Sequence, residues 1–163
     1  MAKGVKFVWI FQQVLQNWEE LKLKEKDGNK SVLGGVPDSL PSIIKSYRIQ
    51  DKARNVGFDW EKREDVWNKV NEEMNEVKTE IENKDKKNIE AEFGDLLFSI
   101  INAARLYGIN PDDALERTNK KFMFRFNHLE KCAKEAGKNL KDMTLAEMDA
   151  YWNEAKELEK QNR

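Results

Sequence analysis

Residues 71–95, "NEEMNEVKTEIENKDKKNIEAEFGD", contain two clusters of carboxylates separated by a polar turn. The first cluster has the pattern EExxE and the second has ExxD. Charge runs of this kind are common on the solvated faces of helices. The segment therefore raises one question: whether it forms two ordinary surface helices or a single acidic site built from both. The acidic residues concerned are Glu72, Glu73, Glu76, Glu92 and Asp95.

Helical periodicity places the first cluster beside an apolar face. At 100° per residue, one stripe holds Val66, Val70, Met74, Val77 and Ile81. The first acid to border this stripe is Glu73, Glu76 lies one step further round, and Glu72 projects further out. Side chains three positions apart on a helix lie about 5–6 Å from each other, so Glu73 and Glu76 can bind the same cation.

The second cluster opens a segment that is apolar on most sides from Phe93 to Ala104. This composition is typical of a buried helix. A polar strip nevertheless follows it at i, i+3, i+7 and i+10, and consists of Glu92, Asp95, Ser99 and Asn102. Carboxylates that leave water need a cation, either a basic side chain or a metal. Two interpretations remain open at this point: ordinary salt-bridged helices, or a metal site.

The ligand chemistry limits which metal is plausible. The available ligands are oxygens, which favour Mg²⁺, with Mn²⁺ as a substitute, over zinc. A di-iron helical bundle requires Glu-x-x-His on two helices, but His128 is the only histidine. Carboxylate-bound Mg²⁺ with open positions commonly serves phosphate chemistry. Lys121 and Arg125, spaced i, i+4, are then candidates for binding phosphate, and Lys69 is a candidate ion-pair partner for the first cluster.

Composition bounds the protein class. The chain has 163 residues, 36% of them charged, and a net charge of −1. Because it has no excess of positive charge, we do not expect it to bind nucleic acid. No apolar run approaches the roughly 20 residues that span a bilayer, which predicts no membrane partner. A single cysteine, Cys132, excludes an internal disulfide and fits a reducing, cytoplasmic location.

The expected architecture is all-α, an antiparallel helix bundle. Helices are predicted over "FQQVLQNWEELKLKEK" near the start and over about 40–55, 61–83 and 88–107. A fifth begins with Asn110 as its N-cap, and the last opens with a capping box at Thr144 and Glu147. The segment "NWEELKLKEK" near the start resembles "YWNEAKELEK" near the end. We therefore expect residues 1–38 to be the last helix of a preceding repeat with its linker, and residues 39–163 to be one domain.

Several motifs in this order resemble the MazG-type nucleoside triphosphate pyrophosphohydrolases. They are "LPSIIKSYRIQDKARNVGFDW", EExxE, ExxD followed by "LLFSIINAARLYGI", "RTNKKFMFRF" and "EMDAYW", and together they span residues 39–156. Many members of this family carry two tandem copies, and this chain resembles the second copy. One departure is Asn88, because some members have a lysine four residues before the first acid of ExxD.

The resemblance implies an all-α fold that forms a homodimer and hydrolyses ribo- or deoxyribonucleoside triphosphates to monophosphate and pyrophosphate with Mg²⁺. By the same resemblance, the metal ligands are Glu73, Glu76, Glu92 and Asp95, and Glu72 is a spare carboxylate able to orient the attacking water or act as a base. The residues expected to contact substrate are Lys69, Asn102, Lys121, Arg125, Trp152 and Trp60.

Two alternatives to a general nucleotide hydrolase follow from the same residues. One is a related pyrophosphatase with a narrower substrate, such as dUTP, dCTP or phosphoribosyl-ATP. The other is a catalytically silent dimerisation or regulatory domain, which predicts weak Mg²⁺ binding without turnover. The presence of all four expected ligands favours an active site over a silent domain.

Overall fold

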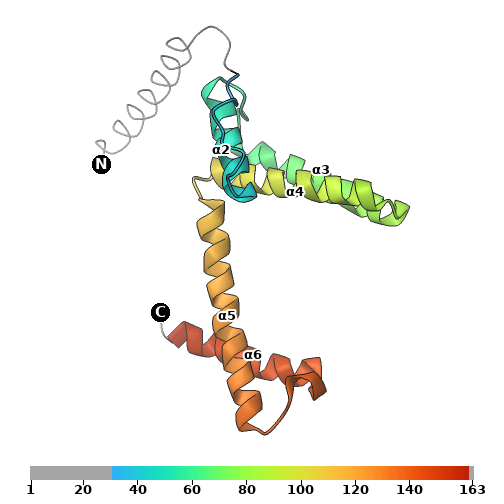
Figure 1. The fold of residues 1–163 in the computed structure, drawn as a ribbon, viewed down its shortest axis with the longest axis vertical. Coiled ribbons are helices and arrows are strands. Elements are labelled where there is room, and N and C mark those ends of the chain that lie inside the picture. The colour runs from blue at the N-terminus through green and yellow to red at the C-terminus, as the bar shows by residue number, and fades with distance from the viewer. Residues whose placement is uncertain (1–30, 162–163) are drawn as a thin grey trace, which may run out of the picture. The chain divides into compact units, whose positions relative to one another are not determined.

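The computed structural model describes residues 31–161, and every helix within that range is shown in Figure 1. The elements are α2 (Ser42–Asn55), α3 (Val66–Asn83), α4 (Lys86–Leu106), α5 (Pro111–Glu135) and α6 (Leu145–Gln161), with short 3-10 helices at Arg63–Asp65 and Leu140–Asp142. Residues 31–161 contain no strand, which confirms the all-α prediction. The chain divides into two compact units, Met1–Pro111 and Asp112–Arg163, and each is described by itself.

The expected first helix, with its echo of the last, lies outside the described residues. The part of the predicted 1–38 segment that is described, residues 31–38, consists mostly of turns. The boundary between residues 38 and 39 therefore stays a prediction.

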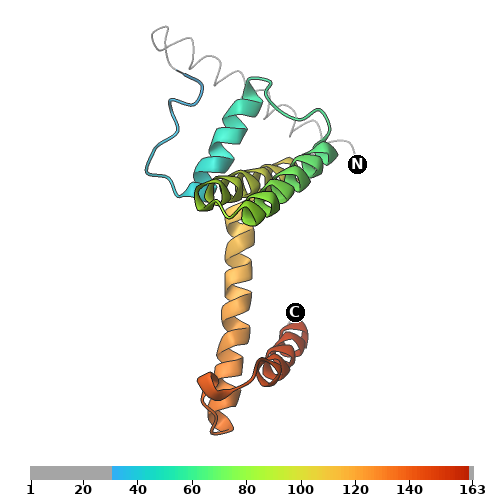
Figure 2. The same cartoon turned by 90° about the vertical axis from the view of Figure 1, so that its right-hand side faces the viewer.

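Helices α3 and α4 form a hairpin closed by a two-residue turn. Lys84 adopts a left-handed conformation with φ 59° at the end of α3, and Asp85 caps the start of α4. The Asp85 carboxylate accepts hydrogen bonds from the backbone N–H groups of Lys87 and Asn88, at 3.0 and 3.3 Å. The two helices lie side by side in both views (Figures 1 and 2). Their shared core consists of Val66, Val70 and Ala103, with Leu96 and Leu106 packed against it.

Helix α2 packs against α4 and is followed by the loop that carries "NVGFDW". Gly57 has φ +88°, a conformation that side chains rarely adopt, and it turns the chain away from the helix. The turn brings Phe58, Asp59 and Trp60 back toward α4. The same loop explains a shift in the third helix, which begins at Val66 rather than near residue 61, because a 3-10 helix occupies Arg63–Asp65.

The prediction that α4 is buried on most sides is wrong for the single chain. Phe93, Leu97 and Ile100 are 46%, 59% and 45% exposed. Among the described residues of its unit, α4 packs mainly against α3 and α2, and two neighbours cannot cover a helix that is apolar nearly all round. A continuous apolar surface therefore remains open on this helix.

The second unit is held together by contacts between α5 and α6. Arg125 donates two hydrogen bonds to Oε2 of Glu159, at 3.0 and 2.7 Å, and the rings of Phe122 and Trp152 lie 5.0 Å apart. The predicted capping box is present, because Glu147 Oε2 accepts from the Thr144 N–H at 2.8 Å. The buried apolar side chains of this unit are Leu129, Ala133, Met143 and Ala155. None of the helices described here has the length and apolar character that a membrane crossing requires.

Candidate functional site

Three carboxylates from two helices meet in the first unit. Glu73 of α3 and Glu92 and Asp95 of α4 each offer one oxygen, and the three oxygens lie within 4.8 Å of one another. Glu73 is only 5% exposed, although α3 is otherwise strongly charged. Antiparallel packing of α3 and α4 produces this meeting, because it brings the middle of one helix against the first turns of the other. We call these three residues the carboxylate cluster.

Glu76, the fourth predicted ligand, lies one turn after Glu73 and is exposed. A hydrogen bond to Glu73 and the negative charges of Glu73 and Glu92 raise the pKa of Glu76 above its ordinary value. The carboxyl group of Glu76 thus borders the carboxylate cluster without belonging to the set of three. A carboxyl group that lies beside other carboxylates has its pKa raised in this way.

Lys69 is the basic side chain that neutralises part of this charge. Its Nζ lies 2.6 Å from Oε1 of Glu73 and 2.9 Å from Oε1 of Glu72. The hydrogen bond to Glu73, followed by that to Glu72, raises the pKa of Lys69 above its ordinary value. Lys69 therefore stays charged and satisfies two carboxylates of the EExxE motif.

Salt bridges do not account for the remaining acids. Within residues 31–161, neither Glu92 nor Asp95 has a lysine or arginine at ion-pair distance. Asp95 is exposed and Glu92 is partly buried, so water also reaches these carboxylates. A group of oxygens with unneutralised charge fits a hard divalent cation such as Mg²⁺ or Mn²⁺.

A different cluster in the second unit has another explanation. His128 Nε2 lies 3.4 Å from Cys132 Sγ and 3.4 Å from Oε1 of Glu154. The contact with Cys132 is a one-turn contact within α5, the contact with Glu154 joins α5 to α6, and the Glu154 side chain is 55% exposed. We therefore interpret these contacts as part of the packing of the two helices.

A cavity of about 570 Å³ lies in the first unit. We call it the α2–α4 pocket; its lining comes mainly from α2, α4 and the loop at residues 57–60. Three of the residues predicted to contact substrate line it: Trp60, Lys69 and Asn102. Since Lys69 is also bonded to Glu73, the wall of the pocket is directly connected to the carboxylate cluster. Most of the remaining lining is apolar: Leu33, Ile49, Ala53, Gly57, Phe58 and Phe98.

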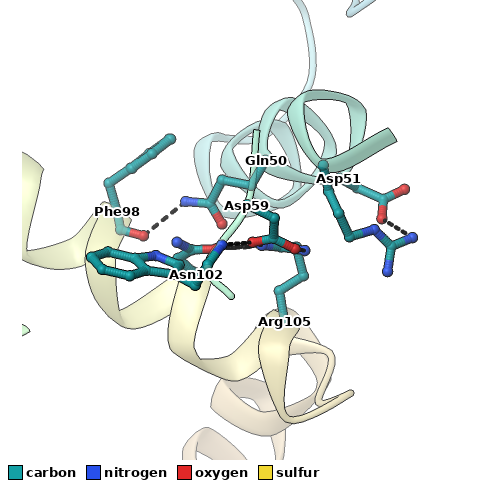
Figure 3. Close-up of polar contacts among 8 residues, drawn as sticks. Gln50, Asp51, Asp59, Phe98, Asn102 and Arg105 are labelled. Carbon is teal, nitrogen blue, oxygen red and sulfur yellow. Dashed lines mark hydrogen bonds and ion pairs between the residues drawn. The ribbon is translucent and has the colours of Figure 1, made fainter. Parts of the chain in front are cut away.

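A polar network fixes the wall formed by α4 and the loop (Figure 3). Arg105 Nη1 donates to Asp59 Oδ2 at 3.1 Å and Nη2 to Asp59 Oδ1 at 2.5 Å. The same guanidinium group donates through Nε and Nη2 to Asn102 Oδ1, at 3.1 and 2.8 Å. The Arg105 side chain is 3% exposed, so this ion pair is a buried support for the pocket rather than a surface contact.

Three further predicted residues lie in the second unit. Lys121 is half-buried on α5. Arg125 binds Glu159, and its guanidinium carbon lies 5.7 Å from the centre of the Trp152 ring. The structure therefore brings Arg125 and Trp152 together. Glu72 belongs to the first unit but lies outside the carboxylate cluster, where it is exposed and bonded to Lys69.

Sequence reasoning missed Gln50, Asp59 and Arg105 as pocket residues. Asp59 and Arg105 lie inside "NVGFDW" and "GDLLFSIINAAR", two of the motifs that carry the family resemblance. An acid in a loop and a base at the end of an apolar helix were a signal that these two elements pair. Gln50 gave a weaker signal, since one amide on a charged helix resembles a solvated position.

Comparisons with known proteins identify one domain family. Residues 62–130 match the MazG nucleotide pyrophosphohydrolase domain, and that range contains the whole carboxylate cluster. The chain is 39% identical over 142 residues to the nucleoside triphosphate pyrophosphohydrolase/pyrophosphatase MazG of Thermotoga maritima, covering 86% of this chain and 54% of that protein.

Two other relatives are similar over a comparable length. The nucleoside triphosphate pyrophosphohydrolase of Escherichia coli K12 is 36% identical over 151 residues, covering 90% of this chain and 57% of its own. The uncharacterized protein YabN of Bacillus subtilis is 49% identical over 151 residues, covering 91% of this chain and 31% of its own. The chain thus spans about half the length of the pyrophosphohydrolases it matches. The domain match and these identities, over most of its residues, show that the chain belongs to the MazG family.

Proposed function

We propose that this protein hydrolyses nucleoside or deoxynucleoside triphosphates to the monophosphate and pyrophosphate, in a reaction that depends on Mg²⁺. The observation that carries this proposal is the double position of Lys69, which lines the α2–α4 pocket and binds Glu73 of the carboxylate cluster. A nucleoside in the pocket would have its phosphates beside the carboxylates. The names of the relatives from Thermotoga maritima and Escherichia coli describe the same activity.

In this proposal the carboxylates hold the cation. Glu73, Glu92 and Asp95 supply one oxygen each, and Glu76 lies close enough to add a fourth ligand or to bind a coordinated water. When bound, Mg²⁺ would neutralise phosphate oxygens and acidify a water molecule. Glu92 and Asp95, which have no basic partner in the described part of the chain, are the residues that such a cation would satisfy most directly.

The remaining residues bind and orient the substrate. Trp60 and Asn102 contact the nucleoside from the pocket wall, and the positive charge of Lys69 attracts the phosphates. For three residues of the second unit the roles come from the family resemblance alone, which assigns Lys121 and Arg125 to the phosphates and Trp152 to the nucleotide. Glu72 orients the attacking water or accepts its proton, a role supported by its position next to Lys69 on the solvent side of α3.

We further propose that the protein acts as a homodimer. The exposed apolar side chains of α4 support this, because Phe93, Leu97 and Ile100 are each more than two fifths exposed on one helix. Exposed apolar patches of this kind commonly mark an interface. A second copy of the chain would cover them, and size-exclusion chromatography with light scattering measures whether it does.

Phosphorus NMR of the products tests the activity. Purified protein is incubated with each of the common ribo- and deoxyribonucleoside triphosphates and Mg²⁺, and the same reactions are repeated with EDTA. Monophosphate plus pyrophosphate, lost with EDTA, is the expected result. Diphosphate plus orthophosphate would contradict attack at the α-phosphorus, and no turnover with any nucleotide would support a silent regulatory domain instead.

The same substrate panel identifies a narrower enzyme. If only dUTP, dCTP or phosphoribosyl-ATP is hydrolysed, the general activity proposed here is wrong and the protein is a specialised relative. Lys121→Ala is expected to raise KM for triphosphates with little effect on folding. An unchanged KM and kcat in this variant would remove Lys121 from the site.

A further inference from the structure

Gln50 has an unusual position in the wall of the α2–α4 pocket. It is a polar residue on α2 that is only 6% exposed, and it lines the pocket. Its Nε2 donates a hydrogen bond to the backbone carbonyl of Phe98 at 2.8 Å, as Figure 3 shows. Its Oε1 is buried and has no hydrogen-bond partner among the described residues. Buried acceptors without partners are uncommon in folded proteins and call for an explanation.

The orientation of the Gln50 amide is fixed by chemistry. A carbonyl oxygen only accepts hydrogen bonds, so the end of the amide that faces Phe98 must be the NH₂ group. Turning the amide over would place two oxygens against each other. Oε1 is therefore the end that is left for another partner, and that partner must be a donor.

The amide of Asn102, another residue of the pocket wall, also has a fixed orientation, but with its donor end left over. Its Oδ1 accepts two hydrogen bonds from Arg105, a side chain that only donates. The NH₂ group of Asn102 is therefore the end that is left to donate. The pocket thus offers one acceptor, from Gln50, and one donor, from Asn102, among mostly apolar and aromatic side chains.

This combination suits a flat heteroaromatic ring with a donor next to an acceptor on one edge. We infer that Gln50 determines base specificity, with its Oε1 accepting a hydrogen bond from an N–H group of the base while Asn102 donates to the neighbouring ring acceptor. The inference rests on the proposed function and adds the group that reads the base. A base without that N–H would leave Gln50 Oε1 unpaired, and such sites reject the deficient analogue strongly.

Matched pairs of nucleotides test the contact between Gln50 and the base. Each pair differs in a single donor: ATP and purine riboside triphosphate, CTP and 2-pyrimidinone riboside triphosphate, UTP and 3-methyl-UTP. For the preferred base, we expect the wild-type protein to favour the nucleotide with the donor by about 10- to 100-fold in kcat/KM. In Gln50→Met this ratio is expected to fall to about threefold or less, because the acceptor is gone.

The ratio separates base recognition from a structural role. If Gln50 only ties α2 to α4 through Phe98, Gln50→Met weakens both members of a pair equally and the ratio is unchanged, which overturns the inference. A wild-type protein that shows no preference in any pair overturns it as well. Arg48→Met, on the same helix but exposed and outside the pocket, is the matched control and is expected to keep the wild-type ratio.

A second variant and a second readout cover the remaining outcomes. Gln50→Glu keeps an acceptor, and its buried carboxyl group, when protonated, can still donate to the Phe98 carbonyl, so it is expected to retain the preference even if Gln50→Met folds poorly. The same pairs are measured as Kd by calorimetry with Mg²⁺. Discrimination in Kd without turnover would support the role of Gln50 and refute the proposed activity, whereas equal Kd values within every pair would refute the role of Gln50.

Discussion

Replacing Asp59 by asparagine tests the reasoning about the pocket wall most directly. Asp59 is the charged partner of Arg105, whose side chain is 3% exposed. The substitution keeps the shape of the side chain and removes its charge. A matched control exists on α2, where Asp51 lies 3.0 Å from Arg54 in an ion pair whose side chains are 36% (Arg54) and 33% (Asp51) exposed.

The expected cost follows from burial and from the contacts that remain. Removing one partner of a buried ion pair costs about 3–5 kcal/mol, because the other charge stays buried and uncompensated. The Asp59 side chain is 19% exposed, and Asn102 still binds the guanidinium group in the variant. These two features lower the expected cost of Asp59→Asn to the bottom of that range or slightly below it, at about 2–4 kcal/mol. Asp51→Asn, in a pair whose two side chains are each about one third exposed, is expected to cost about 0–1 kcal/mol.

Urea unfolding followed by far-UV circular dichroism measures both variants under the same conditions, with the m-value as a check on the compactness of the denatured state. Nucleotide affinity is measured in parallel, and Asp59→Asn is expected to bind more weakly because the wall that carries Asn102 loosens. An Asp59→Asn protein within about 0.5 kcal/mol of the wild type would refute the claim that this ion pair supports the pocket.

Three further perturbations act on the acidic residues. Asp95→Asn is expected to abolish turnover while the thermal midpoint is kept or raised, because clustered negative charge is removed; near-normal turnover would refute its assignment as a ligand. The pKa of Glu76 is raised in the folded state, so its contribution to stability is present below the unfolded pKa near 4.5 and is lost as pH rises through the folded value. With EDTA present, the increase in thermal midpoint of Glu76→Gln over the wild type should therefore be larger at pH 7 than at pH 4. A difference between variant and wild type that is the same at both pH values would contradict this. The opposite sign holds for Glu147, whose hydrogen bonds to Lys138 and Thr144 lower its pKa to about 2. Its contribution is present above pH 4.5 and is lost as pH falls toward 2, so the gap in thermal midpoint between wild type and Glu147→Gln should close over that window.

Local signals in the sequence predicted much of the fold. Cap residues and periodicity identified the helices, and the capping box of α6 and the proline start of α5 were placed correctly. The carboxylate cluster was also predictable, because spacing on a helix fixes which acids border the apolar stripe. Glu73 borders that stripe and is buried in the structure.

Contacts between distant segments were not predictable in the same way. Nothing in the periodicity of α4 shows that Arg105 turns toward a loop residue 46 positions earlier, or that an amide on α2 reaches the carbonyl of Phe98. The exposure of Leu97 was missed for a related reason. Periodicity shows that a face is apolar, but it does not show whether the same chain supplies enough neighbours to cover that face.

The ion pair between Lys69 and Glu73 has a thermodynamic consequence for ligand binding. A divalent cation that enters the carboxylate cluster competes with the ammonium group for the Glu73 carboxylate, so part of its binding energy is used to release Lys69. The ammonium group, which keeps its contact with Glu72 and still lies in the wall of the pocket, would then be more available to an anion. If the protein binds the cation as proposed, cation and anion binding would be coupled, and by linkage each would increase the affinity for the other by the same factor.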